Sequence, residues 1–336
     1  MRPTFSPALV NGPFGDPGLY VDFKFEKRAL LFDLGDLAAL APKQILRVSD
    51  VFVSHTHMDH FIGFDRLLRL SVGRETGVRL YGPPGFVDQV EHKLAAYTWN
   101  LVENYPVDFA MTVCEVTPEW QTRAAQFRCH GRFMREALTP PALPHGVLLE
   151  DPAFSVRATF LEHRTPCLGF AIEEKMHVNV WKNRLAEFGL PTGPWLKGLK
   201  EAVLGGAPDD TPIRAAWRDR DGPHERVLPL GDLKKNVLQL VPGEKIAYVT
   251  DVVHSEDNVR RIAELAADAD QLFIESVFLH EDADHAARKY HLTARQAGTI
   301  ARAARARNVT QFHFSPRYVE REAELRAELE AARTES

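Results

Sequence analysis

The feature that most constrains this chain is a run of histidine and aspartate at residues 54–60, which reads SHTHMDH. The apolar residues 51–53 precede the run and predict a short strand that ends where the run begins. Residues 61–70 follow with apolar side chains at helical spacing, which predicts an amphipathic helix. The run therefore lies in the loop between a strand and a helix, a common place for functional side chains.

Four side chains of this run can bind a metal ion. Side chains alternate along an extended chain, so His55, His57 and Asp59 are expected to share one side as the strand opens into the loop. His60 then begins the turn into the helix. Three imidazoles and a carboxylate at this spacing are typical of a site for a borderline-soft divalent cation, most often zinc. The alternative is a surface loop that happens to be rich in histidine, and it leaves the flanking strand and helix unexplained.

Four later segments of the chain add a family resemblance. They read FLEHRTPCLGFAIEEK at 160–175, GLPTGPWLKGLK at 189–200, HLTARQ at 291–296 and FHFSPRY at 312–318. The HxHxDH pattern after a strand resembles the signature of the metallo-β-lactamase superfamily. The order and content of the later segments resemble ribonuclease Z and its relatives within that superfamily.

This resemblance implies an α/β fold. The expected architecture is an αβ/βα four-layer sandwich, with two facing mixed sheets, helices outside them and metals at one edge between the sheets. Strands and helices alternate along the chain, which is compatible with this architecture. We see no repeat and no clean domain break, so we expect residues 1–336 to form a single metallo-β-lactamase-like hydrolase domain.

The resemblance also implies a site for two metal ions, held by nitrogen and oxygen donors alone. The expected ligands are His55, His57, Asp59, His60, His163, Asp251 and His313. Within this set, Asp251 is expected to bridge the two ions. Two Zn²⁺ ions are the expected cofactors, with Mn²⁺ or Fe as alternatives.

Two adjacent cations suit hydrolysis, because they can make hydroxide available at neutral pH and neutralise charge on a phosphate. Asp59 is expected to take the proton of the attacking water as well as to bind metal. His291 lies just before the helix cap expected at Thr293, and the resemblance implies that it is the general acid. Glu275 is expected to orient a histidine near the site.

Substrate contacts are expected in a basic segment and near the last ligand. Residues 175–200 hold five Lys or Arg against one Glu, together with several Gly and Pro and two Trp. This composition resembles the flexible arm with which ribonuclease Z grips the tRNA body. We therefore expect an inserted substrate-binding arm at about 175–205, with Lys182 and Lys197 on phosphates; an ordinary exposed loop is the alternative. Arg317 and Tyr318 are expected to meet a phosphate near the metals.

Three functions remain open. The first is a dinuclear zinc-dependent phosphodiesterase or endoribonuclease of the ribonuclease Z type, which would process tRNA 3′ ends. The second is a small-substrate metallo-hydrolase acting on a cyclic nucleotide, a lactone or a thioester. The third is a catalytically silent nucleic-acid-binding protein, and the complete ligand set argues against it.

Composition limits the expected partners and the expected cellular compartment of this chain. The net charge of −5 means that a nucleic-acid partner needs a local basic patch. No apolar run approaches the length of a membrane span. The three cysteines are widely spaced and lack a CxxC pair, which suits a reducing cytosol. We expect a cytoplasmic protein that forms a homodimer.

Overall fold

The chain falls into two compact units. The computed structural model describes residues 5–24, 26–75, 77–140 and 144–335. The smaller unit contains Glu150–Ser155 and Glu173–Glu244, and the rest of the described chain belongs to the larger unit. Among the described residues, no helix combines the length and apolar character that crossing a membrane requires. The predicted arm at about 175–205 falls within the smaller unit, and its role in substrate binding stays a prediction.

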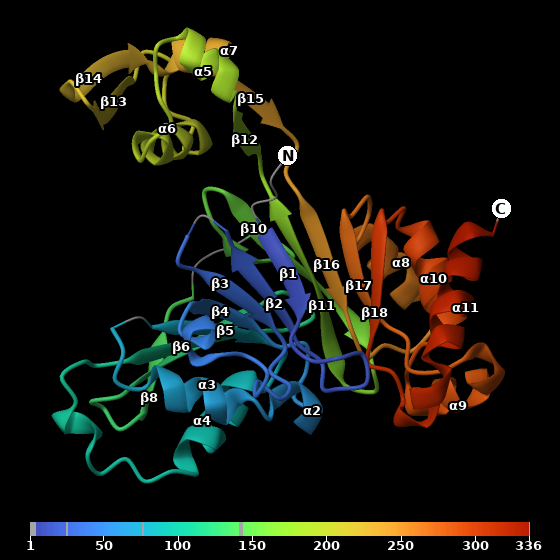
Figure 1. Cartoon of the computed structure of the whole chain (residues 1–336). Helices are drawn as coiled ribbons and strands as arrows, with labels where there is room; N and C mark the ends of the chain where they lie inside the picture. Colours follow the sequence, from blue (N-terminus) through green and yellow to red (C-terminus); the bar gives the residue numbers. More distant parts are fainter. Residues whose placement is uncertain (1–4, 25, 76, 141–143, 336) are drawn as a thin grey trace. The chain divides into compact units, whose positions relative to one another are not determined.

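An eight-stranded mixed sheet forms the first half of the larger unit (Figure 1), and its strands lie side by side in chain order. The strands are β1 Phe5–Leu9, β2 Leu19–Phe23, β3 Ala29–Phe32, β4 Val48–Phe52, β5 Val78–Gly82, β6 Ala110–Val116, β7 Thr122–Arg128 and β8 Arg135–Leu138. Strands β3 to β6 pair in parallel, and the flanking strands pair antiparallel. The loops after β3 and β4 therefore emerge at the same edge.

A six-stranded sheet forms the second half, in the order β18-β17-β16-β11-β10-β9, although one end of each of β9, β10 and β11 belongs to the smaller unit. Its strands are β9 Val147–Glu150, β10 Phe154–Glu162, β11 Pro166–Glu174, β16 Lys245–Val249, β17 Gln271–Glu275 and β18 Asn308–Phe312. Strands β16, β17 and β18 pair in parallel, so the loops that follow them also share one edge.

Aromatic side chains join the inner faces of the two sheets. Phe32 of β3 lies against Phe170 of β11 and Tyr248 of β16, with ring centroids 5.6 and 6.1 Å apart. Phe52 of β4 also contacts Phe170, at 5.9 Å. All four rings are buried, and rings of this size remove a large apolar area from water. The two sheets therefore pack face to face.

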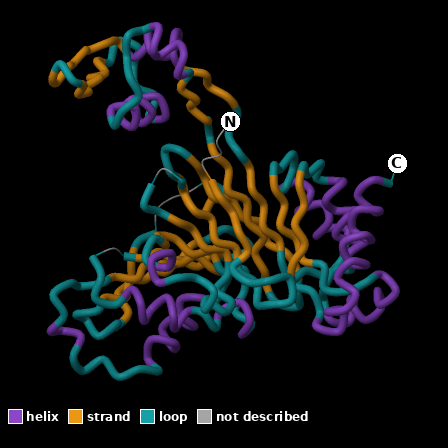
Figure 2. Tube along the Cα trace, in the orientation of Figure 1, coloured by secondary structure: helices purple, strands orange, loops and turns teal. Residues whose placement is uncertain are grey.

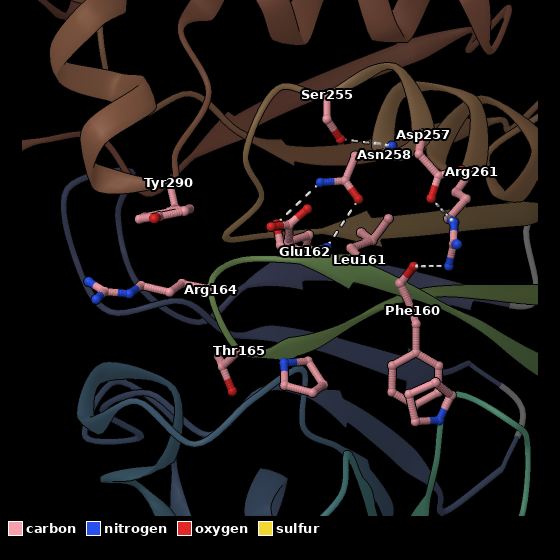
Figure 3. A pocket seen from close by; sticks show the side chains of 12 residues that line it. Phe160, Leu161, Glu162, Arg164, Thr165, Ser255, Asp257, Asn258, Arg261 and Tyr290 are labelled. Carbon is pink, nitrogen blue, oxygen red and sulfur yellow. Dashed lines mark hydrogen bonds and ion pairs between the residues drawn. The ribbon is translucent and has the colours of Figure 1, made fainter.

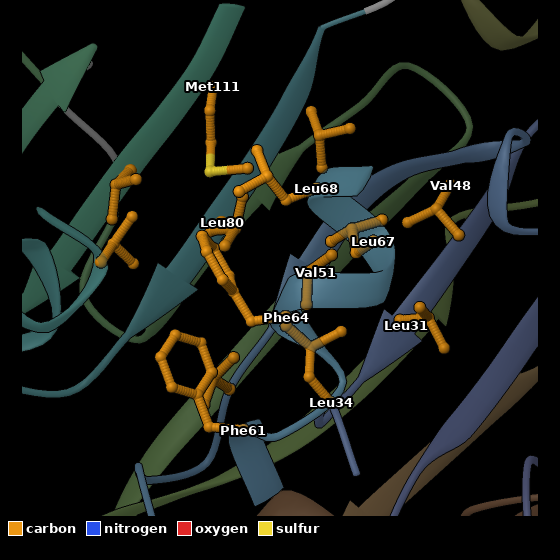
Figure 4. Close-up of a cluster of buried hydrophobic side chains, with 14 of the residues drawn as sticks. Leu31, Leu34, Val48, Val51, Phe61, Phe64, Leu67, Leu68, Leu80 and Met111 are labelled. Carbon is orange, nitrogen blue, oxygen red and sulfur yellow. The ribbon is translucent and has the colours of Figure 1, made fainter. Parts of the chain in front are cut away.

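Helices cover the outer face of each sheet (Figures 1 and 2). On the first sheet, Phe64, Leu67 and Leu68 of α3 pack against Leu80 and Met111 (Figure 4). The helices of this half are α1 Pro42–Ile45, α2 Met58–Phe61, α3 Phe64–Ser71 and α4 Phe86–Ala95. The helices of the second half are α8 Glu256–Leu265, α9 Ala283–Lys289, α10 Ala294–Ala303 and α11 Glu322–Thr334. The larger unit is thus the expected four-layer sandwich.

The helix predicted over residues 61–70 is divided in two by Gly63. The amide of Gly63 donates to Leu34 O at 2.8 Å, and a Cβ at this position would lie 2.1 Å from Gly35 O. The loop after β3 thus passes too close to the backbone for any larger residue at Gly63. As a result α2 ends at Phe61, and Asp59 and His60 are held directly over this loop.

The smaller unit has its own secondary structure and core. Its strands are β12 His177–Val180, β13 Pro212–Asp219, β14 Gly222–Pro229 and β15 Leu238–Val241, and its helices are α5 Lys182–Glu187, α6 Trp195–Leu204 and α7 Leu230–Val237. Strand β12 pairs with β15, and β13 forms a hairpin with β14. Trp195, Leu199, Leu230 and Leu233 are buried together, so this segment is a folded unit.

Candidate metal centre

The predicted ligands lie at strand ends of the larger unit. His55 follows β4, Asp251 follows β16, and His313 directly follows β18. His163 lies in the turn between β10 and β11. Polar loop residues at the carboxyl ends of strands are a common site for ligands in α/β sheets, because the strands place several loops at one edge.

A first group of donor atoms comes from His55, His57, His163 and Asp251, all within 4.8 Å of one another. The Nε2 atoms of His55 and His163 lie 3.6 and 3.3 Å from Oδ2 of Asp251. His55 and His163 are buried, whereas His57 is exposed at the N-terminus of α2. The group therefore has one open side.

A second group comes from Asp59, His60 and His313, again within 4.8 Å. His60 Nε2 and His313 Nδ1 lie 3.4 and 2.8 Å from Oδ1 of Asp251. The structure thus separates Asp59 from His55 and His57, with which it was expected to share one side. The reason is that extended chain ends at His57, and Asp59 already lies in the first turn of α2.

Asp251 connects the two groups, because each of its carboxylate oxygens faces a different one. His55 Nε2 and His60 Nε2 are buried and make no hydrogen bond to any described residue. A buried polar atom without a partner costs free energy, and a bound cation would give both nitrogens one. The donor set of imidazoles and carboxylates therefore fits two divalent cations. The structure brings all seven predicted ligands together, and their individual roles remain a proposal.

Burial and neighbouring charges set the protonation of the centre. Burial, with help from the neighbouring His60, lowers the pKa of His55 to about 2, so this imidazole is neutral. Burial alone would raise the pKa of Asp59, but its hydrogen bond with His313 and the nearby charge of His60 lower it to about 2. Burial acts to lower the pKa of His60 and of His313, but Asp251 and the other neighbouring carboxylates outweigh it, raising the pKa of His60 well above its usual value and that of His313 to about 10. Neutral imidazole and ionised carboxylate are the forms that bind metal, so a cation would displace a proton from each of these two rings.

Asp33 positions His60, and the sequence analysis did not identify it. This carboxylate is fully buried and accepts hydrogen bonds from Ser54 Oγ at 2.9 Å and Tyr248 Oη at 3.0 Å. It also accepts from His60 Nδ1 at 2.9 Å, which leaves Nε2 of that ring directed toward Asp251. Partners of this kind fix the tautomer and orientation of a metal-binding histidine. The available signal was its place directly after an apolar strand, in FDLG.

A backbone carbonyl positions His163 in the same way. His163 Nδ1 donates to the carbonyl oxygen of Tyr290 at 2.7 Å. A carbonyl only accepts, so the proton resides on Nδ1 and Nε2 carries the free lone pair. The ring of His163 is therefore oriented by a residue that lies immediately before His291.

His291 and Glu275 form a pair beside the two groups. Glu275 Oε2 lies 2.9 Å from His291 Nδ1, and Glu275 Oε1 accepts from the amide of Val252 at 2.8 Å. The ring of His291 lies 5.0 Å from that of His163 and 5.6 Å from that of His313. Burial acts to lower the pKa of His291, but the charge and the hydrogen bond of Glu275, together with the charge of Asp251, outweigh it and raise the pKa. This pair has the geometry of an oriented proton donor, and its catalytic role stays a prediction.

The four residues predicted to contact substrate lie in two parts of the chain. The hydroxyl of Tyr318 is bonded to Asp282 and its ring is buried, while Arg317 forms an ion pair with Asp282 at 3.3 Å. Lys182 and Lys197 lie exposed on α5 and α6 of the smaller unit. The role of each in binding substrate stays a prediction.

Relatives and solved structures agree with this description, although no family model matches the chain. Ribonuclease Z of Deinococcus radiodurans is 32% identical over 335 residues, which cover 97% of this chain and 94% of that protein. Ribonuclease Z of Microcystis aeruginosa is 30% identical over 299 residues, 86% of this chain and 76% of that protein.

The fold is shared with two solved structures. Human tRNase Z, short form, matches with a TM-score of 0.50 and 18% identity, covering 94% of this chain and 93% of that one. The metallo-β-lactamase fold protein YhfI from Bacillus subtilis matches with a TM-score of 0.56 and 14% identity, covering 99% and 94%. The predicted fold class is confirmed. Sequence identity over nearly the whole length, together with the intact His/Asp site, shows that this chain belongs to the ribonuclease Z family of metal-dependent hydrolases.

Proposed function

We propose that this chain is an endoribonuclease that cleaves precursor tRNA at its 3′ end with two bound zinc ions. The observation that carries the proposal is the position of Asp251, whose two carboxylate oxygens each face a separate group of histidines. A single carboxylate placed between two donor groups suits a pair of cations. The name of the relatives and of the human tRNase Z supports tRNA as the substrate.

The first ion would be held by His55, His57 and His163, the second by Asp59, His60 and His313, and Asp251 would bridge them. Bound there, divalent cations supply Lewis-acid charge for a phosphate group and lower the pKa of a water molecule toward neutrality.

The chain's own residues move the protons. The side chain of Asp59 is 42% exposed at the edge of the centre, where it can accept a proton from the attacking water. Glu275 holds Nδ1 of His291, which leaves Nε2 free to protonate the departing 3′-oxygen. The upstream RNA product would then carry a 3′-hydroxyl.

The smaller unit supplies the RNA-binding surface in this proposal. Lys182 and Lys197 are exposed cations on its helices, and such side chains bind phosphates irrespective of base sequence. Trp195 is buried in the core of this unit, so it cannot stack on a base. The face of Trp181 is covered by the guanidinium of Arg184, 3.6 Å from the ring centre. The smaller unit therefore binds mainly through charge.

We further propose a cytoplasmic homodimer. The three cysteines are free, which suits a reducing compartment. Met58 and Ile62 are large apolar side chains that are 76% and 45% exposed near α2, as expected of residues at a protomer contact. Light scattering on purified protein measures the molar mass, and a monomeric mass would contradict the dimer.

The decisive experiment compares two substrates. Protein reconstituted with zinc, and separately with manganese, is incubated with precursor tRNA and with bis(p-nitrophenyl) phosphate. We expect cleavage of both, and an RNA product with a 3′-hydroxyl that a ligase accepts. His92→Ala is the control for loss of a histidine outside the centre. His92 is exposed on α4, so this variant should leave the rates on both substrates unchanged.

Two outcomes would contradict the proposal. A lactone, thioester or cyclic nucleotide cleaved far faster than RNA would make the chain a small-substrate hydrolase. RNA binding without any turnover in the metal-loaded protein would make it a catalytically silent binding protein.

A further inference from the structure

A pocket (Figure 3) is lined entirely by residues of the larger unit. Its volume is about 530 Å³, within the range of pockets that hold small ligands. Arg164 and Tyr290 both line it. Arg164 directly follows His163 and Tyr290 directly precedes His291 in the chain. The pocket therefore adjoins the proposed metal ligand and the proposed proton donor.

The backbone at both residues adopts a conformation that bulky side chains rarely take. Tyr290 has φ +61° and Arg164 has φ +57°, in the left-handed region that favours glycine. At Tyr290 this conformation ends α9 and directs the carbonyl at His163. Glycine would adopt it at lower cost, and the carbonyl that holds His163 Nδ1 belongs to the backbone. The ring of Tyr290 lies edge-on to His163, with ring centroids 6.4 Å apart, and it also lines the pocket, which indicates a second use for it.

Arg164 stands next to that ring without a polar partner. Its guanidinium carbon lies 5.9 Å from the ring centre of Tyr290, and it forms no hydrogen bond or ion pair with any described residue. Arg261, in the same pocket, is already engaged: it donates to Phe160 O at 3.0 Å and pairs with Asp257 at 2.7 Å. Arg164 is thus free to contact a ligand.

The chemistry of the pocket favours a nucleobase over a phosphate. A phenol ring and a planar guanidinium are the surfaces on which bases stack in single-stranded RNA. The charges of Asp257 and Arg261 cancel in their ion pair, and the carboxylate of Glu162 offsets Arg164, so the pocket lining carries no net positive charge for a phosphate. An uncharged aromatic base can use the stacking surface without needing such a charge.

We propose that Tyr290 and Arg164 bind the base of the nucleotide immediately upstream of the scissile bond. This inference rests on the proposed function. Tyr290 precedes His291, which in that function protonates the departing 3′-oxygen, and this oxygen belongs to the upstream nucleotide. Stacking of that base fixes the nucleotide whose 3′-oxygen receives the proton. The pair thereby selects RNA over small phosphodiesters.

The test compares the wild type with Tyr290→Gly and Tyr290→Phe. Glycine removes the ring and suits the left-handed backbone, while phenylalanine keeps the ring. We expect Tyr290→Gly to lower kcat/KM for precursor tRNA roughly 5- to 100-fold more than for bis(p-nitrophenyl) phosphate. Tyr290→Phe should stay close to wild type on both. An abasic site at the upstream nucleotide should cost the wild type a similar factor and should cost Tyr290→Gly little more.

The matched control is Arg305→Gly. Arg305 has φ +54° and lies before β18, at the opposite end of that strand from His313. Arg305→Gly should leave the rates on both substrates unchanged. That result would distinguish the effect of a relaxed backbone from the effect of losing the Tyr290 ring.

Equal losses on both substrates, or additive losses for the variant and the abasic site, would overturn the base pocket and leave the proposed function standing. An abasic site that leaves the wild-type rate unchanged would also overturn the base pocket and leave the proposed function standing, and this measurement needs no variant. A wild type that cleaves bis(p-nitrophenyl) phosphate but no RNA would overturn the proposed function and this inference together.

Discussion

The two units of this chain hold the side chains proposed for function in opposite ways. In the larger unit the side chain of Asp251 is only 3% exposed, and His60 and His163 beside it are oriented by hydrogen bonds within the protein. In the smaller unit the side chain of Lys197 is 76% exposed, and its ion pair with Glu201, at 3.7 Å, is of the weak surface kind. Buried and oriented groups suit a chemical step, whereas exposed cations suit attraction of a polyanion. The chemical step and the charge-driven part of RNA affinity should therefore separate by unit.

The largest effect is expected from Asp251→Ala, which removes the carboxylate shared by both donor groups. Cleavage of precursor tRNA and of bis(p-nitrophenyl) phosphate should both be abolished, and elemental analysis should show that neither metal ion is retained. Asp268→Ala is the control, since Asp268 is also an aspartate with positive φ but is exposed and paired with Arg305. A variant that keeps two metal ions would contradict the shared role of Asp251.

His291→Ala should leave metal binding intact and slow RNA cleavage by roughly 10²- to 10⁴-fold. Bis(p-nitrophenyl) phosphate should be affected less, because nitrophenolate departs without needing a proton. Single-turnover rates on the two substrates measure the difference. The general-acid role would be refuted by equal losses.

Asp33→Asn tests whether the hydrogen bond from His60 to this buried carboxylate orients the His60 ring for metal binding. The amide keeps the shape but not the charge that holds Nδ1 of His60, so metal affinity should fall about 10- to 100-fold. The control is Asp50→Asn, because Asp50 is a second buried carboxylate, paired with Arg28 at 3.0 Å and Arg79 at 2.6 Å. It should lower the free energy of unfolding and leave metal affinity unchanged. Competition titration with a zinc chelator distinguishes the two variants.

Glu275→Gln should shift the pH profile of RNA cleavage. The charge of Glu275 raises the pKa of His291, so the protonated donor persists to higher pH in the wild type. Without that charge the pKa falls, and the alkaline decline of the rate should begin at a lower pH. An unchanged profile would mean that His291 is not the group that titrates.

The smallest effect on chemistry is expected from Lys182→Glu combined with Lys197→Glu in the smaller unit. KM for precursor tRNA should rise, and the slope of log affinity against log salt should shrink by about one for each phosphate that these lysines neutralise in the wild type. Hydrolysis of the small phosphodiester should stay near the wild-type rate. Lys24→Glu with Lys27→Glu makes the same charge change on the larger unit. If both pairs raise KM equally, attraction depends on net charge and the comparison between the units fails.

Sequence reasoning reaches furthest where the information is local. The spacing of His55, His57 and His60 predicts metal binding because six residues at a strand end cannot lie far apart. His163, Asp251 and His313 are distant in the chain, and only the family resemblance placed them at the centre.

What could not be predicted depends on contacts across the fold. The helix break at Gly63 arises from the close approach of Gly35 O, and periodicity carries no trace of that contact. Asp33 looked like an ordinary residue at the end of a strand, because its partner Tyr248 is distant in the chain and joins it only in the fold. The extent of the smaller unit depends on the pairing of β12 with β15, which a local composition window cannot detect.

The shared carboxylate of Asp251 has a thermodynamic consequence for loading of the centre. In the proposed centre, the first ion to bind would neutralise and immobilise the carboxylate that the second ion also needs. The two binding events would therefore be linked by a coupling free energy, which acts equally in both directions. If ordering of Asp251 dominates, the sites fill cooperatively and a chelator empties them in one transition. If repulsion between the cations dominates, removal occurs in two steps and a half-loaded protein accumulates.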